Sequence, residues 1–396
     1  MKFVIVICLL SVFSFSSFAQ TGDPLKSSKV VAKKVKVNGN DVVVCDQSLF
    51  DNTITIPLSA FTEELQIVKL DDADEALVKE TEVIVGEKYI LVKGSQQIPF
   101  KLFDKKTGKF LNNIGAFGQG PNEYQNVYSM QLDEESGRVY LLPWQSKKIL
   151  AYDLKGKALD PIPLHVGSLK GNFNVNTKAG TVTVSVLPFP KATHVVWTQT
   201  LKGELIKGVV PNHLEVDGNS IFNNEMSARD FGNIYSFSVF TFDPRLDSLY
   251  NYQHASDKLI PAFTTKFNST KLPIHDYYES RNYYWGSFSE PKKESENITV
   301  TQNHRFYIVD KKTLKGSFFK LENDFLGNDE IRWPVVTLLG DYFVRNIDPG
   351  NLFDMLEKVL ASNKKLTPAQ KTKLTKLKDS ITDNDNNYIL YAKIKK

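Results

Sequence analysis

The stretch FDKKTGKFL, Phe103–Leu111, joins an aromatic residue and an acidic turn to a glycine and a returning apolar run. The same order recurs at Tyr152–Leu159, and in weaker form at Gln199–Ile206 and Val309–Gly316. Successive starts at residues 103, 152 and 199 lie about fifty residues apart. A hairpin-bearing unit with that period indicates a β-propeller blade of about four strands.

The spacing of these copies sets the expected number of blades. The gap before the last copy spans about two periods, so a divergent blade is expected near Tyr235–Phe263. Short β-branched or aromatic runs such as Tyr89–Val92, separated by Gly, Asn and Asp, support an all-β chain. We therefore predict an all-β, six-bladed β-propeller over residues 41–396, preceded by a flexible segment at residues 20–40.

The C-terminal region predicts a small helical insertion in the last blade, at about residues 350–382. Apolar residues between Leu352 and Leu360 follow helical spacing, and Thr367–Gln370 has the pattern of a capping box with proline at the first helical position. The final run, Tyr388–Ile394, is expected to be a strand that closes the ring by pairing with Thr53–Ile56.

The N-terminus predicts export. A basic Met1-Lys2, an apolar run at Phe3–Phe13 and a Ser-rich segment ending at Ala19 match a secretory signal peptide, residues 1–19, cut after Ala19. Cys8 lies inside the apolar run rather than after it, which argues against a lipoprotein. We expect a soluble protein of the periplasm or the extracellular space, with no membrane span.

The remaining composition excludes some partners. The formal charge of +4 over 396 residues includes no basic stripe interleaved with aromatic residues, so nucleic-acid binding gains no support. Without the leader, Cys45 is the one remaining cysteine, and its apolar surroundings favour a buried structural thiol. The six histidines are scattered without a metal-binding pattern, so no metal site is predicted from spacing.

The run IGAFGQGPNEY, Ile114–Tyr124, resembles the GQGPxEY signature of a six-bladed β-propeller family common among exported Bacteroidetes proteins. The clear resemblance covers Leu65–Leu159 and implies a propeller fold, export and a binding role, with no catalytic residue. Related NHL-like and TolB-like propeller architectures include interaction modules and metal-dependent lactonases, so the resemblance leaves both classes open.

The glycines of this run raise the possibility of a phosphate-binding loop. Glu123 stands where a third glycine would be needed, and no helix or Lys-Ser/Thr pair follows. A structural corner between blades is the better interpretation, in which Glu123 accepts hydrogen bonds from loop amides and Tyr124 fills the gap between blades. The residues of this structural signature are Gly115, Gly118, Gly120, Pro121, Glu123 and Tyr124.

The run Tyr277–Trp285 is the best candidate for binding, because it combines flat aromatic faces with an arginine and an asparagine. The alternative is that its alternate residues belong to the blade core. Two further arginines could point into an axial channel or form structural ion pairs. The candidate ligand-binding residues are Arg229, Arg281, Asn282, Tyr283, Tyr284, Trp285 and Arg345.

The sequence therefore supports two functions. The first is an exported, non-enzymatic binding or scaffold propeller that holds a small molecule, a glycan or a protein at the axial channel or on one face, and acts as a monomer. The second is a metal-assisted hydrolase or lactonase of the propeller type; no cofactor is predicted, and Ca²⁺ could serve under this alternative. Three or four acidic, Asn or His side chains converging on one axial point would favour the enzyme.

Overall fold

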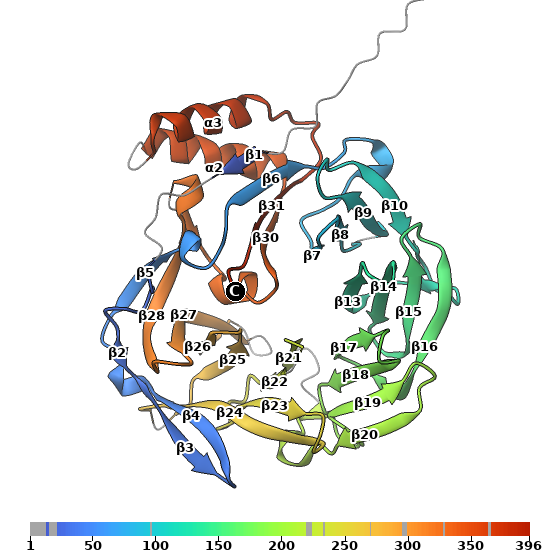
Figure 1. Cartoon of the computed structure of the whole chain (residues 1–396), viewed down its shortest axis with the longest axis vertical. Helices are drawn as coiled ribbons and strands as arrows, with labels where there is room; N and C mark the ends of the chain where they lie inside the picture. The colour runs from blue at the N-terminus through green and yellow to red at the C-terminus, as the bar shows by residue number, and fades with distance from the viewer. Residues whose placement is uncertain are drawn as a thin grey trace, which may run out of the picture.

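The computed structural model describes residues 13–15, 22–95, 97–218, 224–232, 234–269, 271–294, 299–327, 329–362 and 366–396. Its strands form a ring of β-sheets around a central axis (Figure 1). This arrangement is a β-propeller, as the repeated hairpins predicted. The ring contains five blades of four consecutive antiparallel strands and one closing sheet of a different kind.

The five blades follow one another along the chain. The first has β7 (Val83–Val85), β8 (Tyr89–Val92), β9 (Phe100–Asp104) and β10 (Phe110–Ile114). The second has β13 (Val127–Asp133), β14 (Arg138–Pro143), β15 (Ser146–Asp153) and β16 (Ala158–Ser168). The third has β17 (Gly171–Asn176), β18 (Thr181–Val186), β19 (Val196–Thr200) and β20 (Leu205–Val209). The fourth has β21 (Glu225–Asp230), β22 (Tyr235–Phe240), β23 (Leu249–Gln253) and β24 (Lys258–Lys266). The fifth has β25 (Ile274–Glu279), β26 (Tyr283–Lys293), β27 (Thr299–Asp310) and β28 (Lys315–Asn323), and β29 (Asp329–Ile331) extends it.

Each predicted hairpin joins the third and fourth strands of a blade. The acidic residue of the turn caps it: Asp104 Oδ1 accepts a hydrogen bond from the Thr107 amide at 2.8 Å. Gly108 follows in the left-handed region at φ +71°, and a Cβ there would lie 1.9 Å from the Lys69 carbonyl oxygen. Glycine is therefore required at this position both by the backbone and by the neighbouring sheet. The divergent blade expected near Tyr235–Phe263 is the fourth blade.

The predicted count of six blades is wrong: the ring has five blades and is completed by a sheet taken from both ends of the described chain. Its order is β1 (Phe13–Phe15), β6 (Leu65–Lys69), β31 (Tyr388–Lys393) and β30 (Tyr342–Ile347). Counting periods assumes that every unit is a run of four consecutive strands. The closing sheet has no such run, so the period does not describe it.

The predicted partner of the last strand is also wrong. Thr53–Pro57 forms β5, which pairs in parallel with β28 on the outside of the fifth blade. Strand β31 pairs instead with β6, where Leu390 lies opposite Ile67. The burial of the two strands explains the choice, since β6 is mostly buried, as an inner member of a sheet should be, whereas β5 has exposed threonines and suits an edge.

The N-terminal segment, predicted to be flexible at residues 20–40, contains two strands instead. Strand β2 (Lys29–Val30) pairs with β28, and β3 (Ala32–Val37) forms a hairpin with β4 (Asn40–Asp46). Strand β4 then pairs in parallel with β24, so this segment lies along the outside of the fourth and fifth blades (Figure 1). Burial of Val31 at 1% exposure holds the lysine-rich segment against the ring. Cys45 in β4 is 0% exposed, which confirms a buried thiol.

Helices are few. Within the described ranges, three α-helices lie between β28 and β31: α1 (Pro334–Thr337), α2 (Pro349–Ser362) and α3 (Pro368–Asp379). The capping box is confirmed, because the Thr367 side chain accepts from the Gln370 amide and the Gln370 side chain accepts from the Thr367 amide. The short 3-10 helices among the described residues are Gln47–Leu49, Leu58–Ala60, Asp74–Ala76, Asn212–Leu214 and Asp324–Leu326. Cys8 and the predicted cleavage point at Ala19 lie outside the described residues.

The glycine-rich run forms a corner between the first two blades. Strands β11 (Ala116–Phe117) and β12 (Glu123–Tyr124) pair in parallel across it. The Glu123 carboxylate accepts a hydrogen bond from the Gly120 amide at 2.9 Å, so this amide already has a partner within the protein. Tyr124 is 3% exposed and packs in the cluster that joins the two blades. These contacts agree with the structural interpretation of the run.

Candidate functional site

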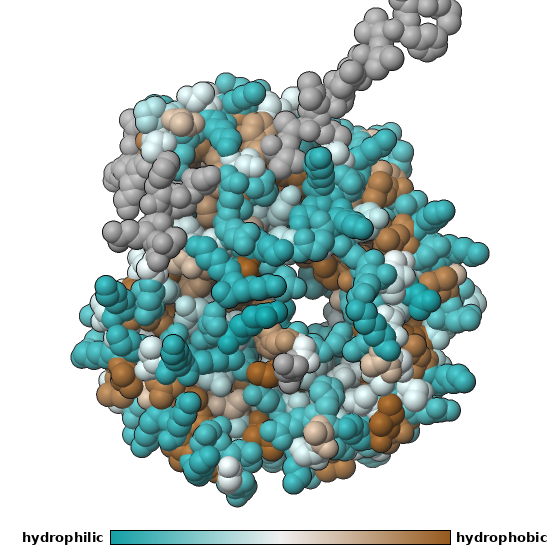
Figure 2. Space-filling model, in the orientation of Figure 1, coloured by the Kyte–Doolittle hydropathy of each residue, from teal (hydrophilic) through white to brown (hydrophobic). Residues whose placement is uncertain are grey.

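The axis of the ring is hollow. The innermost strands β7, β13, β17, β21, β25 and β30 surround it in Figure 1, and Figure 2 shows an opening at the centre bordered largely by hydrophilic residues. The space amounts to a cavity of about 1210 Å³. That exceeds the roughly 300–1,000 Å³ of common small-molecule sites, so it can hold a ligand of several units.

Many polar side chains along the channel wall are occupied in holding neighbouring blades together. Gln131 on β13 donates to the Val175 carbonyl at 2.9 Å and accepts from the Val175 amide at 2.8 Å. Asn172 on β17 in turn donates to the Ala228 carbonyl on β21 at 3.2 Å. An innermost strand has a free edge whose backbone groups need partners, and these amides supply them. They position the wall and have little capacity left for a ligand.

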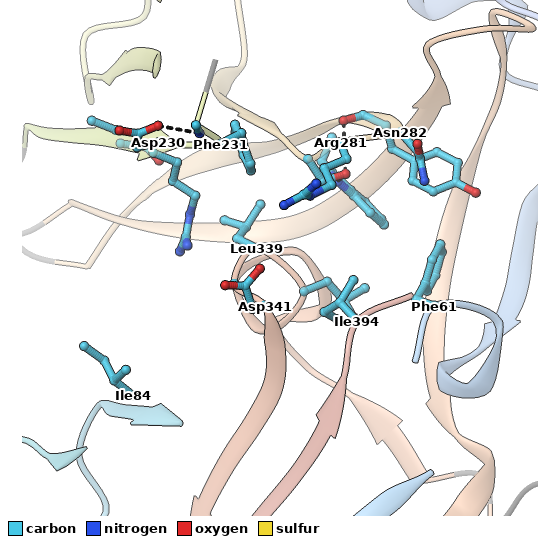
Figure 3. Close-up of a pocket in the computed structure, with 18 of the residues that line it drawn as sticks. Phe61, Ile84, Asp230, Phe231, Arg281, Asn282, Leu339, Asp341 and Ile394 are labelled. Carbon is cyan, nitrogen blue, oxygen red and sulfur yellow. Dashed lines mark hydrogen bonds between the residues drawn. The ribbon is translucent and has the colours of Figure 1, made fainter. Parts of the chain in front are cut away.

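Arg229 is different. It lies on β21 at the cavity, half-buried, and its guanidinium has no hydrogen bond or ion pair within the described part of the chain. Burial lowers the pKa of Arg229 from its ordinary value, and the more distant charges of Glu82 and Asp341 oppose that shift. Figure 3 shows the Asp341 carboxylate turned toward the open space. The wall of the channel therefore presents a cation without a direct counterion.

A second part of the site lies in the turn between β25 and β26. Arg281 and Asn282 form this turn, and both line the main cavity together with Tyr283. The Arg281 side chain points into the pocket in Figure 3. The same three residues border an adjoining cavity of about 490 Å³ beside Asp310. Burial raises the pKa of Tyr283 to about 12, and the nearby Asp310 charge adds to the shift. Three of the candidate residues of this run therefore line the cavity.

The remaining predicted residues of β26 lie on opposite faces of the strand, because side chains alternate along it. Tyr284 points to the opposite face from Tyr283 and stacks on Phe263 in the core, with ring centroids 4.7 Å apart and an interplanar angle of 17°. Trp285 reaches the cavity wall but is only 1% exposed, and its Nε1 donates to Ser280 Oγ at 3.0 Å. Tyr284 is therefore a core residue, and Trp285 supports the wall.

Arg345 is not among the residues that line the cavity. It lies on β30, where its guanidinium is 3.7 Å from the Asp329 carboxylate and 3.7 Å from Met355 Sδ. Of the two alternatives for this arginine, the ion pair agrees with the structure and the axial channel does not. Its ion-pair partner comes from β29 and its sulfur contact from α2, two elements whose positions the sequence did not reveal.

One polar group escaped the sequence analysis. Asp276 on β25 accepts hydrogen bonds from the Tyr278 hydroxyl and from the Tyr277 amide, the latter at 2.8 Å. Burial raises the pKa of Asp276 to about 7. The Arg229 charge acts on Tyr278, so the cluster adjoins the arginine. Side chains alternate along β25, so Asp276 and Tyr278 lie on the same face of the strand. This alternation could have predicted the pair, but only after β25 was known to be an innermost strand.

The apolar part of the site lies across from Arg281. Figure 3 shows Leu339, Ile394 and Phe61 on this side of the pocket, with Ile84 further along the wall.

Among the described residues, no group of three or more His, Cys, Asp or Glu side chains is placed to hold a metal ion. None of the described helices is long and apolar enough to cross a membrane.

Comparison with known proteins gives a family and a fold. A family model described as "Domain of unknown function (DUF4934)" matches residues 40–393. No curated protein matches the chain.

Many solved structures match the chain, among them two proteins of Bacteroides species. One is a protein of Bacteroides fragilis NCTC 9343 described as exported, with 16% identity, a TM-score of 0.57, and coverage of 89% of this chain and 100% of the other. Another is a member of the duf4221 family from Bacteroides vulgatus ATCC 8482, with 13% identity, a TM-score of 0.47, and coverage of 84% and 97%. At such identities the first likeness shows a shared fold alone.

Proposed function

The chain belongs to the family described as domain of unknown function DUF4934, and we propose that it is an exported, non-enzymatic binding propeller whose axial channel holds its ligand. The observation that carries this proposal is the hollow axis of about 1210 Å³, bordered by arginine, asparagine and aromatic side chains. Concave sites that combine apolar walls with a few directed polar groups are the usual form of ligand sites.

Two further features support binding in the channel rather than on the outer surface. The inner strands are cross-linked by side chains such as Gln131 and Asn172, so the wall is preorganised. Arg229 and Arg281 project from that rigid wall without acidic partners in the described chain. We propose export because residues 1–19 match a signal peptide. The Bacteroides fragilis protein of similar fold is described as exported, which is consistent with this proposal.

The experiment is a ligand screen with a blocked channel. Ser227 lies on β21 on the same face as Arg229, because Met226 and Ala228 pack into the core on the other face. Ser227→Trp should therefore fill part of the channel. The control is Leu205→Trp on the outer strand β20, where Leu205 is 38% exposed.

We expect at least one compound from a panel of sugars, oligosaccharides, amino acids and peptides to raise the melting temperature of the wild type and of Leu205→Trp, but not of Ser227→Trp. Circular dichroism checks that both variants fold. If Ser227→Trp does not fold, Ser227→Cys modified with a bulky maleimide replaces it. A compound that stabilises the blocked protein as well as the wild type, or a panel without any active member, contradicts channel binding.

A further inference from the structure

Two unpaired guanidinium groups share one cavity. Arg229 comes from β21 and Arg281 from the turn after β25, and neither guanidinium has a hydrogen bond or an ion pair in the described structure. Some other charges along the same wall are paired: Lys393 lies 2.9 Å from Glu87, and Glu82 lies 3.2 Å from Lys93. The cavity thus has two unpaired positive groups in its wall, which also contains acids such as Asp341.

Burying a guanidinium without a counterion is costly, because the charge loses water and gains nothing of equal strength. Arg229 is half-buried at the cavity wall, and the charges of Asp341 and Glu82 act on it without a direct contact. An anionic group on a ligand would complete the missing pair. Arginine suits a planar carboxylate in particular, because its fork of N–H donors matches the two oxygens.

The rest of the cavity limits the kind of anion. Phe61, Leu339 and Ile394 provide an apolar wall, and Asn282 and Asp341 provide groups that bind hydroxyls. A sugar ring has an apolar face and a rim of hydroxyls, so it matches both surfaces. The cavity of about 1210 Å³ has room for several such rings.

A peptide is less well matched. Peptides that bind β-proteins in extended form use the free edge of a strand for backbone hydrogen bonds. Two of the innermost strands have such edge groups occupied, since Gln131 pairs with the Val175 backbone and Asn172 with the Ala228 carbonyl. A ligand that binds through hydroxyls and carboxylates does not need these backbone groups.

We propose that the axial channel binds an acidic oligosaccharide, with a uronic-acid carboxylate held between Arg229 and Arg281 and the sugar rings against the Phe61 and Leu339 side. This inference rests on the proposed function and specifies its ligand class. Binding of the carboxylate supplies the counterion that Arg229 lacks, and Asp341 accepts hydrogen bonds from ring hydroxyls.

The test is calorimetric titration of the full chain with tetragalacturonic acid and, in parallel, with the neutral galactose tetrasaccharide of the same linkage. The acid should bind and the neutral sugar should bind at least about ten-fold more weakly, since a charge-assisted hydrogen bond is lost. Arg281→Gln, in an exposed turn, and Arg229→Gln should each weaken binding of the acid by about ten- to a hundred-fold. Arg332→Gln removes the same charge from an exposed position outside the cavity and should leave affinity within about two-fold.

The outcomes separate this inference from the proposal on which it rests. If the neutral sugar or a peptide binds as tightly as the acid, and Ser227→Trp blocks that binding, the channel is a ligand site but not one for uronic acids. If Arg281→Gln and Arg332→Gln weaken binding of the acid equally, the effect is one of net charge and the assigned arginines are wrong. If Arg229→Gln does not fold, Arg281→Gln alone decides the question.

Discussion

Tyr124 shows how a single hydroxyl joins two blades. It accepts a hydrogen bond from the Phe100 amide at 2.9 Å and donates one to the Ile114 carbonyl, both in the first blade. Its ring meets Phe100 edge-on at 5.3 Å and lies beside Tyr152 of the second blade. The hydroxyl thus satisfies two buried backbone groups at the place where the glycine-rich run turns.

Tyr124→Phe should lower the free energy of unfolding by about 1–3 kcal/mol, because the Phe100 amide and the Ile114 carbonyl lose a buried partner. Urea unfolding of both proteins measures the difference. The control is Tyr391→Phe, since Tyr391 is 7% exposed and its hydroxyl has no hydrogen bond among the described residues. Equal effects of the two substitutions would show that the hydroxyl of Tyr124 does not hold the corner.

The raised pKa of Asp276 predicts that the stability of the fold depends on pH. Its pKa is about 7 in the folded protein against an ordinary 3.8, so the folded state binds this proton more tightly than the unfolded state. Its contribution to stability is fully present below about pH 4 and is lost as the pH rises through about 7. The total is at most about 4 kcal/mol.

Asp276→Asn should therefore remove a fall in stability between pH 4 and pH 7 that the wild type shows. The measurement is the free energy of unfolding at several pH values, compared as the difference between the two proteins. Asp383→Asn, in an exposed turn, serves as the control. A difference curve that is flat across this range would contradict a raised pKa at Asp276.

At the scale of elements, the closing sheet depends on a side chain outside its strands. Asn386 precedes β31, is 2% exposed, and donates to the carbonyls of Asp71 at 2.7 Å and Ala76 at 2.9 Å. Its own side-chain oxygen accepts from the Val78 amide at 3.1 Å. The loop between β6 and β7 is thereby tied to the strand that completes the ring.

Asn386→Ala should destabilise the fold by at least about 2 kcal/mol, because three backbone groups lose their partner and two of them are carbonyls with few alternatives. Thermal unfolding measures the loss. Asn384→Ala, two residues earlier and exposed, is the matched control and should change the melting temperature by no more than a degree or so. Comparable losses in the two variants would show that Asn386 has no special part in closure.

The elements also show where sequence reasoning succeeds. The hairpins at Phe103–Leu111 and Tyr152–Leu159 could be found because a tight turn needs an acidic cap and a glycine at fixed positions, and these demands are local. The capping box at Thr367–Gln370 is local in the same way. The partner of the last strand was not predictable, because β5 and β6 are both short apolar runs and only tertiary packing distinguishes an edge from an inner strand.

For the whole molecule, the ring arranges one strand from each sheet around a common axis, so residues far apart in sequence meet there. The sequence indicated the run at Arg281–Tyr283 by its composition, and this run does line the channel. For Arg345 and Tyr284 the sequence left two alternatives open, because composition cannot show which face of a strand looks inward; the structure shows an ion pair and a core position. Asp276 was missed because its importance comes from burial, which a sequence does not display.

The central claim is that the channel at the axis holds the ligand, and protection of a single thiol tests it most directly. In a Cys8→Ser background, Ser227→Cys places a thiol on the channel face of β21, while Cys45 at 0% exposure does not react. Leu205→Cys on β20 gives the external control.

The quantity measured is the rate of labelling by a small maleimide, with and without saturating tetragalacturonic acid. The sugar should slow labelling at residue 227 by at least about ten-fold and leave labelling at residue 205 unchanged. Binding of the sugar with no change in labelling at residue 227 would contradict a ligand site in the channel.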